Sequence, residues 1–227
     1  MRASRELLAA FALAVLLDLA FLAVGFRTGH VVAKVLLMPL LAASAARAGA
    51  PRLLVAALLC GWGGDVLLLS AADPAFMAGM ASFAAGHVCY LVLFRRVRRV
   101  RRQGPPHARA RLLGLAYAAA LVTLVALLWP DLPTGLRVPV AGYSALLTAM
   151  AYTAATRLGP AAALGGALFM VSDTLIATGV ADWPQLPRPD FWIMLTYAAA
   201  QFLLVRGTLD ARRAPATAYR EVRSTTP

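Results

Sequence analysis

Eight long apolar segments alternate with short polar connections along the chain. Each segment is roughly 16–20 residues long, about the length of a helix that crosses a bilayer, and none shows the strict alternation of a half-buried strand. We expect helices over residues 7–24, 31–46, 53–69, 76–94, 112–129, 138–153, 161–178 and 191–205. The sequence therefore predicts an all-α, polytopic membrane protein with eight transmembrane helices.

Positive charge marks every second connection. Arginines precede the first segment, cluster in the even-numbered connections and follow the last segment, whereas the odd-numbered connections carry few. Because Lys and Arg in short loops favour the cytoplasmic side, we expect both termini in the cytoplasm and the protein in the inner (cytoplasmic) membrane of the cell, as a multi-pass protein. Residues 1–207 are predicted as the transmembrane domain, and residues 208–227 as a disordered basic cytoplasmic tail.

The composition supports a membrane protein and narrows its partners. Hydrophobic residues make up 61% of the chain, which leaves too few polar groups to cover a soluble surface. The net charge of +12 is concentrated between the apolar segments, and the run Arg95–Arg111 predicts a loop attracted to anionic membrane lipids. We expect no nucleic-acid partner, because no separate soluble domain carries the charge. Cys60 and Cys89 lie inside apolar segments and indicate neither a disulfide framework nor a metal site.

Two of the apolar segments contain a carboxylate in a matching context. Gly64-Asp65 in the third segment and Ser172-Asp173 in the seventh are each followed by any residue, Leu and an aliphatic residue. An ionisable side chain inside a membrane segment is costly, so it indicates a functional site by default. At a rise of about 1.5 Å per residue, both carboxylates lie roughly 7 Å below the outer rim. We therefore predict that Asp65 and Asp173 form one site.

Further polar residues fall at a similar depth or deeper, on other segments. They have structural interpretations as well: Asp18 and Lys34 can neutralise each other between the first two segments, and His87 can be a hydrogen-bonded core histidine. Tyrosines at this level are also common in the interfacial belt. Gln201 lies near mid-bilayer with His87. The supporting or substrate-binding residues that we predict are Lys34, His87, Tyr90, Asp18, Ser172, Tyr143 and Tyr197.

Two carboxylates in a cavity of low dielectric constant favour one proton between them, so that one acts as a general acid and the other as a base. Such a pair suits hydrolysis through an oxocarbenium-like state, peptide cleavage or proton relay. The candidate classes are a lipid-processing hydrolase, an intramembrane aspartic protease and a proton-coupled membrane carrier. The protease class prefers Gly-x-Gly-Asp, but Trp62 stands three residues before Asp65. A carrier favours broken helices in matching halves, and Pro39 is the only proline in the middle of a segment.

Three motifs surround these polar residues: Gly64-Asp65-x-Leu-Leu-Leu, Phe83-x-x-Gly86-His87-x-x-Tyr90, and Gly166-Ala167-x-Phe169-x-x-Ser172-Asp173. Together they resemble the YhhN family of membrane lysoplasmalogenases, over roughly Lys34 to Ile176. Lys34, ahead of Pro39, is similar to the family's Lys-Pro segment, with the proline displaced from the lysine.

The resemblance implies eight spans and hydrolysis of the vinyl ether bond of lysoplasmalogens to a fatty aldehyde and a glycerophospho-alcohol. It also implies that Asp65 and Asp173 are catalytic. Protonation of the vinyl ether carbon leaves an oxocarbenium ion that water can trap, so an Asp pair is sufficient without a metal or other cofactor. Lys34 is a candidate ligand for the phosphate of the lysophospholipid substrate.

Overall fold

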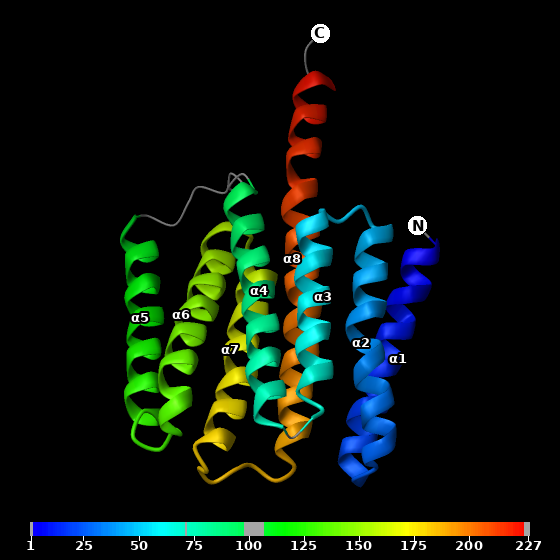
Figure 1. Ribbon diagram of the computed structural model, residues 1–227. Coiled ribbons are helices and arrows are strands. Elements are labelled where there is room, and N and C mark those ends of the chain that lie inside the picture. Colours follow the sequence, from blue (N-terminus) through cyan, green and yellow to red (C-terminus); the bar gives the residue numbers. More distant parts are fainter. Residues whose placement is uncertain (1, 71, 98–106, 225–227) are drawn as a thin grey trace.

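A single bundle of helices forms the protein. The computed structural model describes residues 2–70, 72–97 and 107–224, and within them the chain forms eight α-helices. Their bounds are α1 (Arg2–Val24), α2 (Arg27–Arg47), α3 (Arg52–Leu67), α4 (Asp73–Arg96), α5 (His107–Leu128), α6 (Thr134–Arg157), α7 (Pro160–Val180) and α8 (Pro189–Ser224). Successive helices alternate in direction, so both termini lie at the same end of the bundle (Figure 1). The prediction of an all-helical membrane protein is confirmed.

Seven of the described helices are long and apolar enough to cross a membrane by length and composition. The exception is α3, which has 16 residues, whereas the next shortest helices, α2 and α7, have 21. It begins after Pro51 and ends at Leu67, earlier than the predicted end at residue 69, and its chain continues as a turn through Ser70. Leu68, in this turn, lines both cavities described below.

The last helix is longer than its apolar pattern predicted. The predicted span ended at residue 205 and the predicted tail began at residue 208, but α8 continues without a break to Ser224. Its packing explains the difference over the first turns, because Thr208 and Ala211 are buried. A Cβ atom on Gly207 would lie 2.6 Å from the Cβ of Ala162 on α7, so glycine allows the two helices to approach closely here.

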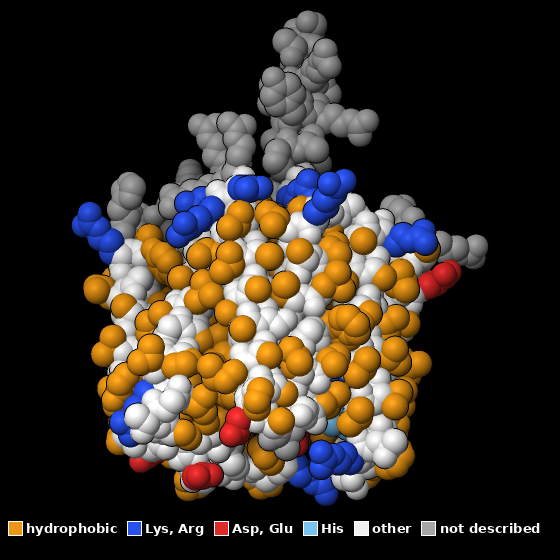
Figure 2. Space-filling model, viewed as in Figure 1, with side chains coloured by type: hydrophobic (Ala, Val, Ile, Leu, Met, Phe, Trp, Pro, Cys, Tyr) orange, Lys and Arg blue, Asp and Glu red, His pale blue; other side chains and the backbone are white. Residues whose placement is uncertain are grey.

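The bundle surface separates apolar and basic side chains. Apolar side chains cover its flank, and Lys and Arg gather at the end where the termini lie (Figure 2). Arg95 and Arg96, in the last turn of α4, are exposed at this end. Residues 98–106 of the predicted lipid-binding run lie outside the described residues. Inside the bundle, the most extensive helix contacts are α7 with α8, α1 with α2 and α3 with α4.

Candidate active site

Glycines allow α3 and α4 to pack with their backbones close together. A Cβ atom on Gly86 of α4 would lie 3.1 Å from the carbonyl oxygen of Ala57 on α3, and a Cβ on Gly64 would collide with the ring of Phe83. Small residues at such contacts are a common feature of helix association in membranes. The glycines just before Asp65 therefore bring its helix turn against α4.

Asp65 ends a chain of hydrogen bonds that crosses the core. The Tyr197 hydroxyl donates to Asp65 Oδ2 at 2.8 Å, Gln201 Nε2 donates to the Tyr197 oxygen at 3.3 Å, and the Tyr90 hydroxyl donates to Gln201 Oε1 at 2.6 Å. All four side chains are buried. A Cβ on Gly61 would lie only 3.0 Å from the Tyr197 hydroxyl oxygen, so glycine at this position leaves room for the chain.

Asp173 ends a second, shorter chain of hydrogen bonds. The Tyr143 hydroxyl donates to Asp173 Oδ2, and the Tyr143 oxygen lies 3.0 Å from His87 Nε2. Because the Tyr143 hydrogen points to the carboxylate, His87 must present its Nε2–H as the donor to Tyr143. The other ring nitrogen, His87 Nδ1, is buried and has no hydrogen-bond partner among the described residues. Each Asp is thus held by a tyrosine from a neighbouring helix.

Two phenylalanines fill the space between the two chains. The ring of Phe169 stands edge-on to His87 at 4.8 Å and to Tyr197 at 5.5 Å between centroids. Phe83 packs edge-on against Tyr197 at 5.9 Å and against Phe169 at 6.5 Å. This aromatic packing fixes the ring orientations on which both hydrogen-bond chains depend.

The hydrogen-bond chains of the two carboxylates pack on the same aromatic ring. Phe169 contacts His87 in the chain of Asp173 and Tyr197 in the chain of Asp65. The two Asp–Tyr pairs therefore lie around one aromatic cluster. Among the described residues, no group of three or more His, Cys, Asp or Glu side chains is arranged to hold a metal ion.

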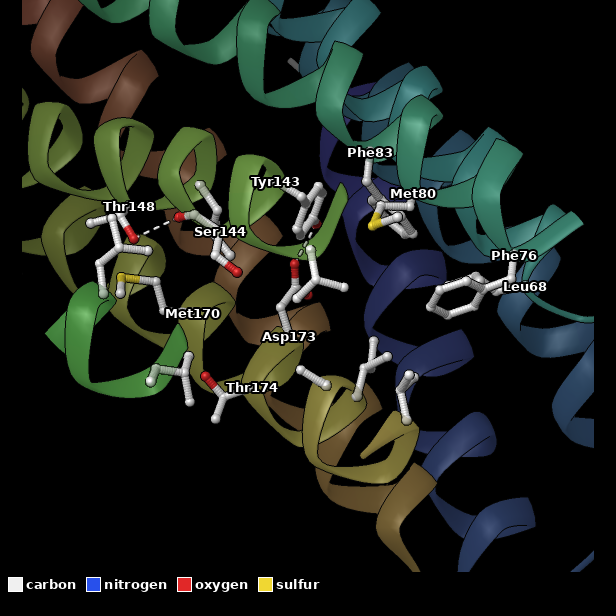
Figure 3. A pocket seen from close by; sticks show the side chains of 17 residues that line it. Leu68, Phe76, Met80, Phe83, Tyr143, Ser144, Thr148, Met170, Asp173 and Thr174 are labelled. Atoms are coloured by element: carbon white, nitrogen blue, oxygen red, sulfur yellow. Dashed lines mark hydrogen bonds between the residues drawn. The ribbon is translucent and has the colours of Figure 1, made fainter. Parts of the chain in front are cut away.

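Asp173 and Tyr143 face an apolar cavity between α4, α5, α6 and α7 (Figure 3). The cavity encloses about 770 Å³, counting the space open at its mouth. Its few polar side chains are Tyr143, Ser144, Thr148, Asp173 and Thr174. An apolar pocket with a small number of polar groups at one place is the usual form of a ligand site.

A second cavity opens beside the first, between α1, α2 and the start of α8. It encloses about 1070 Å³ by the same measure and is lined by several charged side chains, including Lys34. Leu68, one helical turn after Asp65, lines both cavities. The turn that follows Asp65 therefore borders both an apolar cavity and a charged cavity.

Two predicted site residues make other contacts. Asp18 is buried, and its Oδ1 pairs with His30 Nδ1 at 2.7 Å; among the described residues it has no ion pair with Lys34, so the structural interpretation in which these two charges neutralise each other does not hold. Depth placed Asp18 and Lys34 at one level but could not fix the rotation of α1. Ser172 is buried and donates to the carbonyl oxygen of Ile193 at 3.2 Å, which ties α7 to α8.

The sequence interpretation missed His30, because the second apolar segment was taken to begin at residue 31. In the structure α2 begins at Arg27, and His30 lies within its first turn. Extending the depth argument one turn beyond each apolar segment would have found it.

Comparison with known protein families identifies the family of this chain. The family model described as the YhhN family matches residues 29–208. The chain belongs to the YhhN family. This YhhN protein is 35% identical to human lysoplasmalogenase TMEM86B over 167 residues, which cover 74% of this chain and 66% of the human protein. It is 36% identical to pig lysoplasmalogenase TMEM86B over 148 residues, which cover 65% of this chain and 59% of the pig protein.

A bacterial relative gives a similar match. The lysoplasmalogenase of Mycobacterium tuberculosis is 32% identical over 173 residues, which cover 72% of this chain and 63% of the mycobacterial protein. This YhhN chain thus spans only about three-fifths to two-thirds of the length of the curated relatives it matches. No solved structure matches it significantly.

Proposed function

We propose that the protein is a membrane hydrolase that cleaves the vinyl ether bond of lysoplasmalogens to a fatty aldehyde and a glycerophospho-alcohol. The observation that carries the proposal is the pair of carboxylates, each held by a tyrosine: Asp65 is buried, and the half-buried Asp173 faces an apolar cavity. The similarity to proteins named lysoplasmalogenase supports the same reaction. The cavity suits a single hydrocarbon chain, and its acid would face the bond at the polar end of that chain.

The reaction needs one acid and one base. The acid transfers a proton to the outer carbon of the vinyl ether, which leaves an oxocarbenium ion at the carbon bonded to oxygen. Water adds to this carbon while the base takes a proton from the water. The resulting hemiacetal then breaks its bond to the glycerol oxygen. That oxygen receives the proton held by the base, and the proton of the hemiacetal hydroxyl restores the acid, so the products are an aldehyde and a free alcohol. A carboxyl and a carboxylate supply both transfers.

The surroundings of the two carboxylates favour different roles. Asp173 faces an apolar space, which favours a neutral carboxyl there and makes it the acid. Asp65 ends the longer hydrogen-bond chain, through Tyr197 and Gln201, so the negative charge of the pair is better placed on Asp65, which would act as the base. In this proposal His87 and Tyr143 return a proton to Asp173. Tyr197 alone contacts and orients Asp65, and Gln201 and Tyr90 stabilise the core around Tyr197.

Purified protein in detergent tests the proposal when lysoplasmenyl-ethanolamine is added and aldehyde is measured. Asp65→Asn and Asp173→Asn should each abolish aldehyde release, while Asp210→Asn, on the exposed C-terminal part of α8, should retain it. Protein folding is checked by the thermal unfolding of each variant. Release at the wild-type rate from either variant would rule out the acid and base pair. Proton flux into liposomes without aldehyde release would indicate a carrier instead, and cleavage of a transmembrane peptide would indicate a protease.

We also propose that both termini face the cytoplasm and that the protein resides in the inner membrane. The end of the bundle that carries the termini also carries most of its Lys and Arg, which supports this orientation and a contact with anionic lipids there (Figure 2). The two catalytic carboxylates then lie toward the opposite, outer side of the membrane.

A further inference from the structure

Three basic side chains lie on one face of α2. Arg27, His30 and Lys34 are spaced three and four residues apart, and residues at this spacing share a helix face. All three line the second cavity. Asp18 on α1 holds His30 through Nδ1, which leaves Nε2 as the ring nitrogen available to a ligand.

The opposite wall of this cavity comes from the start of α8. Arg188, Asp190 and Phe191 line it. The backbone of Arg188 has a φ of 55°, a left-handed conformation that is uncommon for a residue other than glycine. Backbone in such sparsely populated regions persists where the surroundings impose it, and it concentrates at ligand sites. The strained residue thus carries a cationic side chain at the wall of the cavity.

The charges of this cavity are not neutralised by one another. Among the described residues the only ion pairs within 4.0 Å are His30 with Asp18 and Arg206 with Asp210. Lys34, which is half-buried within a membrane helix, therefore has no carboxylate at that distance. A cation in this position is stabilised when an anion binds beside it.

We propose that this cavity, lined by Arg27, His30, Lys34, Arg188 and Asp190, binds a zwitterionic phospho-ammonium headgroup. The basic side chains bind the phosphate, and Asp190, beside the ring of Phe191, binds the ammonium group. The inference rests on the proposed function in taking a lysophospholipid as the ligand. It goes further by assigning headgroup selectivity to residues outside the Asp pair.

The relation between the two cavities supports this assignment. Leu68 lines both, so a ligand with its chain in the apolar cavity and its headgroup in the charged cavity would pass the turn that follows Asp65. A lysoplasmalogen has this shape, because a three-carbon glycerol separates its vinyl ether from its phosphate. The vinyl ether would then lie near the turn that follows Asp65 and beside Asp173, which lines the apolar cavity.

Three substrates distinguish binding of the phosphate from binding of the ammonium group. They are 1-alkenylglycerol, 1-alkenylglycerol 3-phosphate and lysoplasmenyl-ethanolamine. Arg188→Asn is the phosphate variant, because Asn tolerates the left-handed backbone better than most residues. It should raise KM about tenfold for both phosphate-bearing substrates relative to 1-alkenylglycerol, the effect of one lost charge-assisted contact. Asp190→Asn should lower the preference for the ethanolamine substrate over the 3-phosphate by about tenfold. Arg206→Gln and Asp210→Asn are the charge-matched controls on α8, and they should change neither ratio.

A binding measurement keeps this inference separate from the proposed reaction. Displacement of a labelled lysophosphatidylethanolamine, which has an ester in place of the vinyl ether, reports headgroup binding without turnover. If neither the wild type nor any variant hydrolyses the ether, but Arg188→Asn and Asp190→Asn bind the labelled lipid less tightly than the wild type, the headgroup site stands and the proposed reaction is wrong. If hydrolysis occurs and both variants treat the three substrates as the wild type does, the headgroup site is overturned. Absence of binding by the wild type also overturns it.

Discussion

Replacing Tyr197 with Phe should test whether the hydrogen bond to Asp65 serves the reaction. The substitution keeps the ring against Phe83 and Phe169 but removes the hydroxyl that donates to Asp65 at 2.8 Å and accepts from Gln201 at 3.3 Å. A hydrogen bond to a charged group contributes about 1.5–3 kcal/mol. If that interaction holds Asp65 in its reactive orientation, losing it lowers kcat about 10- to 100-fold. The longer bond to Gln201 adds a smaller loss, so the free energy of unfolding should fall by about 2–4 kcal/mol in all.

Tyr90→Phe is the matched control, because Tyr90 stands at the other end of the same chain. Its removal leaves Gln201 Oε1 without its 2.6 Å donor but leaves the Tyr197 bond to Asp65 in place. We expect a comparable loss of thermal stability in detergent and a kcat for aldehyde release within about threefold of the wild type, since less than 1 kcal/mol of transition-state stabilisation is at stake. An equal fall in kcat for the two variants would refute a specific role of Tyr197. An unchanged kcat for Tyr197→Phe would do the same.

Two further predictions concern packing and the apolar cavity. Gly64→Ala should lower thermal stability by several degrees, because its Cβ would collide with an aromatic ring of α4, whereas Gly142→Ala, where a Cβ meets nothing within 4 Å, should be neutral or stabilising by up to about 1 kcal/mol. Equal melting temperatures would contradict the close α3–α4 approach. Ala177→Phe, in the wall of the apolar cavity, should raise KM for long alkenyl chains more than for short ones, measured as aldehyde release across a chain-length series. A uniform change across chain lengths would show that the chain lies elsewhere.

The sequence predicted the helices with few errors and brought together residues that the structure joins by hydrogen bonds. Apolar length and the alternation of arginines were sufficient for eight helices, because the bilayer imposes both patterns directly on the chain. The depth argument placed Asp65, Asp173, Tyr143 and Tyr197 in one layer, and the structure joins them into two Asp–Tyr pairs. These results follow from positions along each helix axis, which the sequence fixes through the rise per residue.

The depth of a residue along a helix does not determine how that helix is rotated about its own axis. Their similar depths allowed Asp18 and Lys34 to pair, but α1 turns Asp18 toward His30. Lipid-facing positions are as apolar as the positions buried between helices, so hydropathy gives no strong signal for which face meets which neighbour. The bounds of α3 and α8 also differ from the apolar segments, and in α8 the buried Thr208 and Ala211 extend the packed helix beyond its apolar segment.

The position of α5 determines which concentration of substrate should govern the rate. This helix packs mainly on α6, and its Leu121 and Leu124 form part of the wall of the apolar cavity. The cavity is thus bordered by a peripheral helix whose other side chains face the hydrocarbon region. For a substrate that enters from the lipid phase, the effective concentration is its surface density in the bilayer. Rates should therefore saturate with the mole fraction of substrate in the micelle or vesicle, and added inert lipid should lower the rate by dilution at constant bulk concentration.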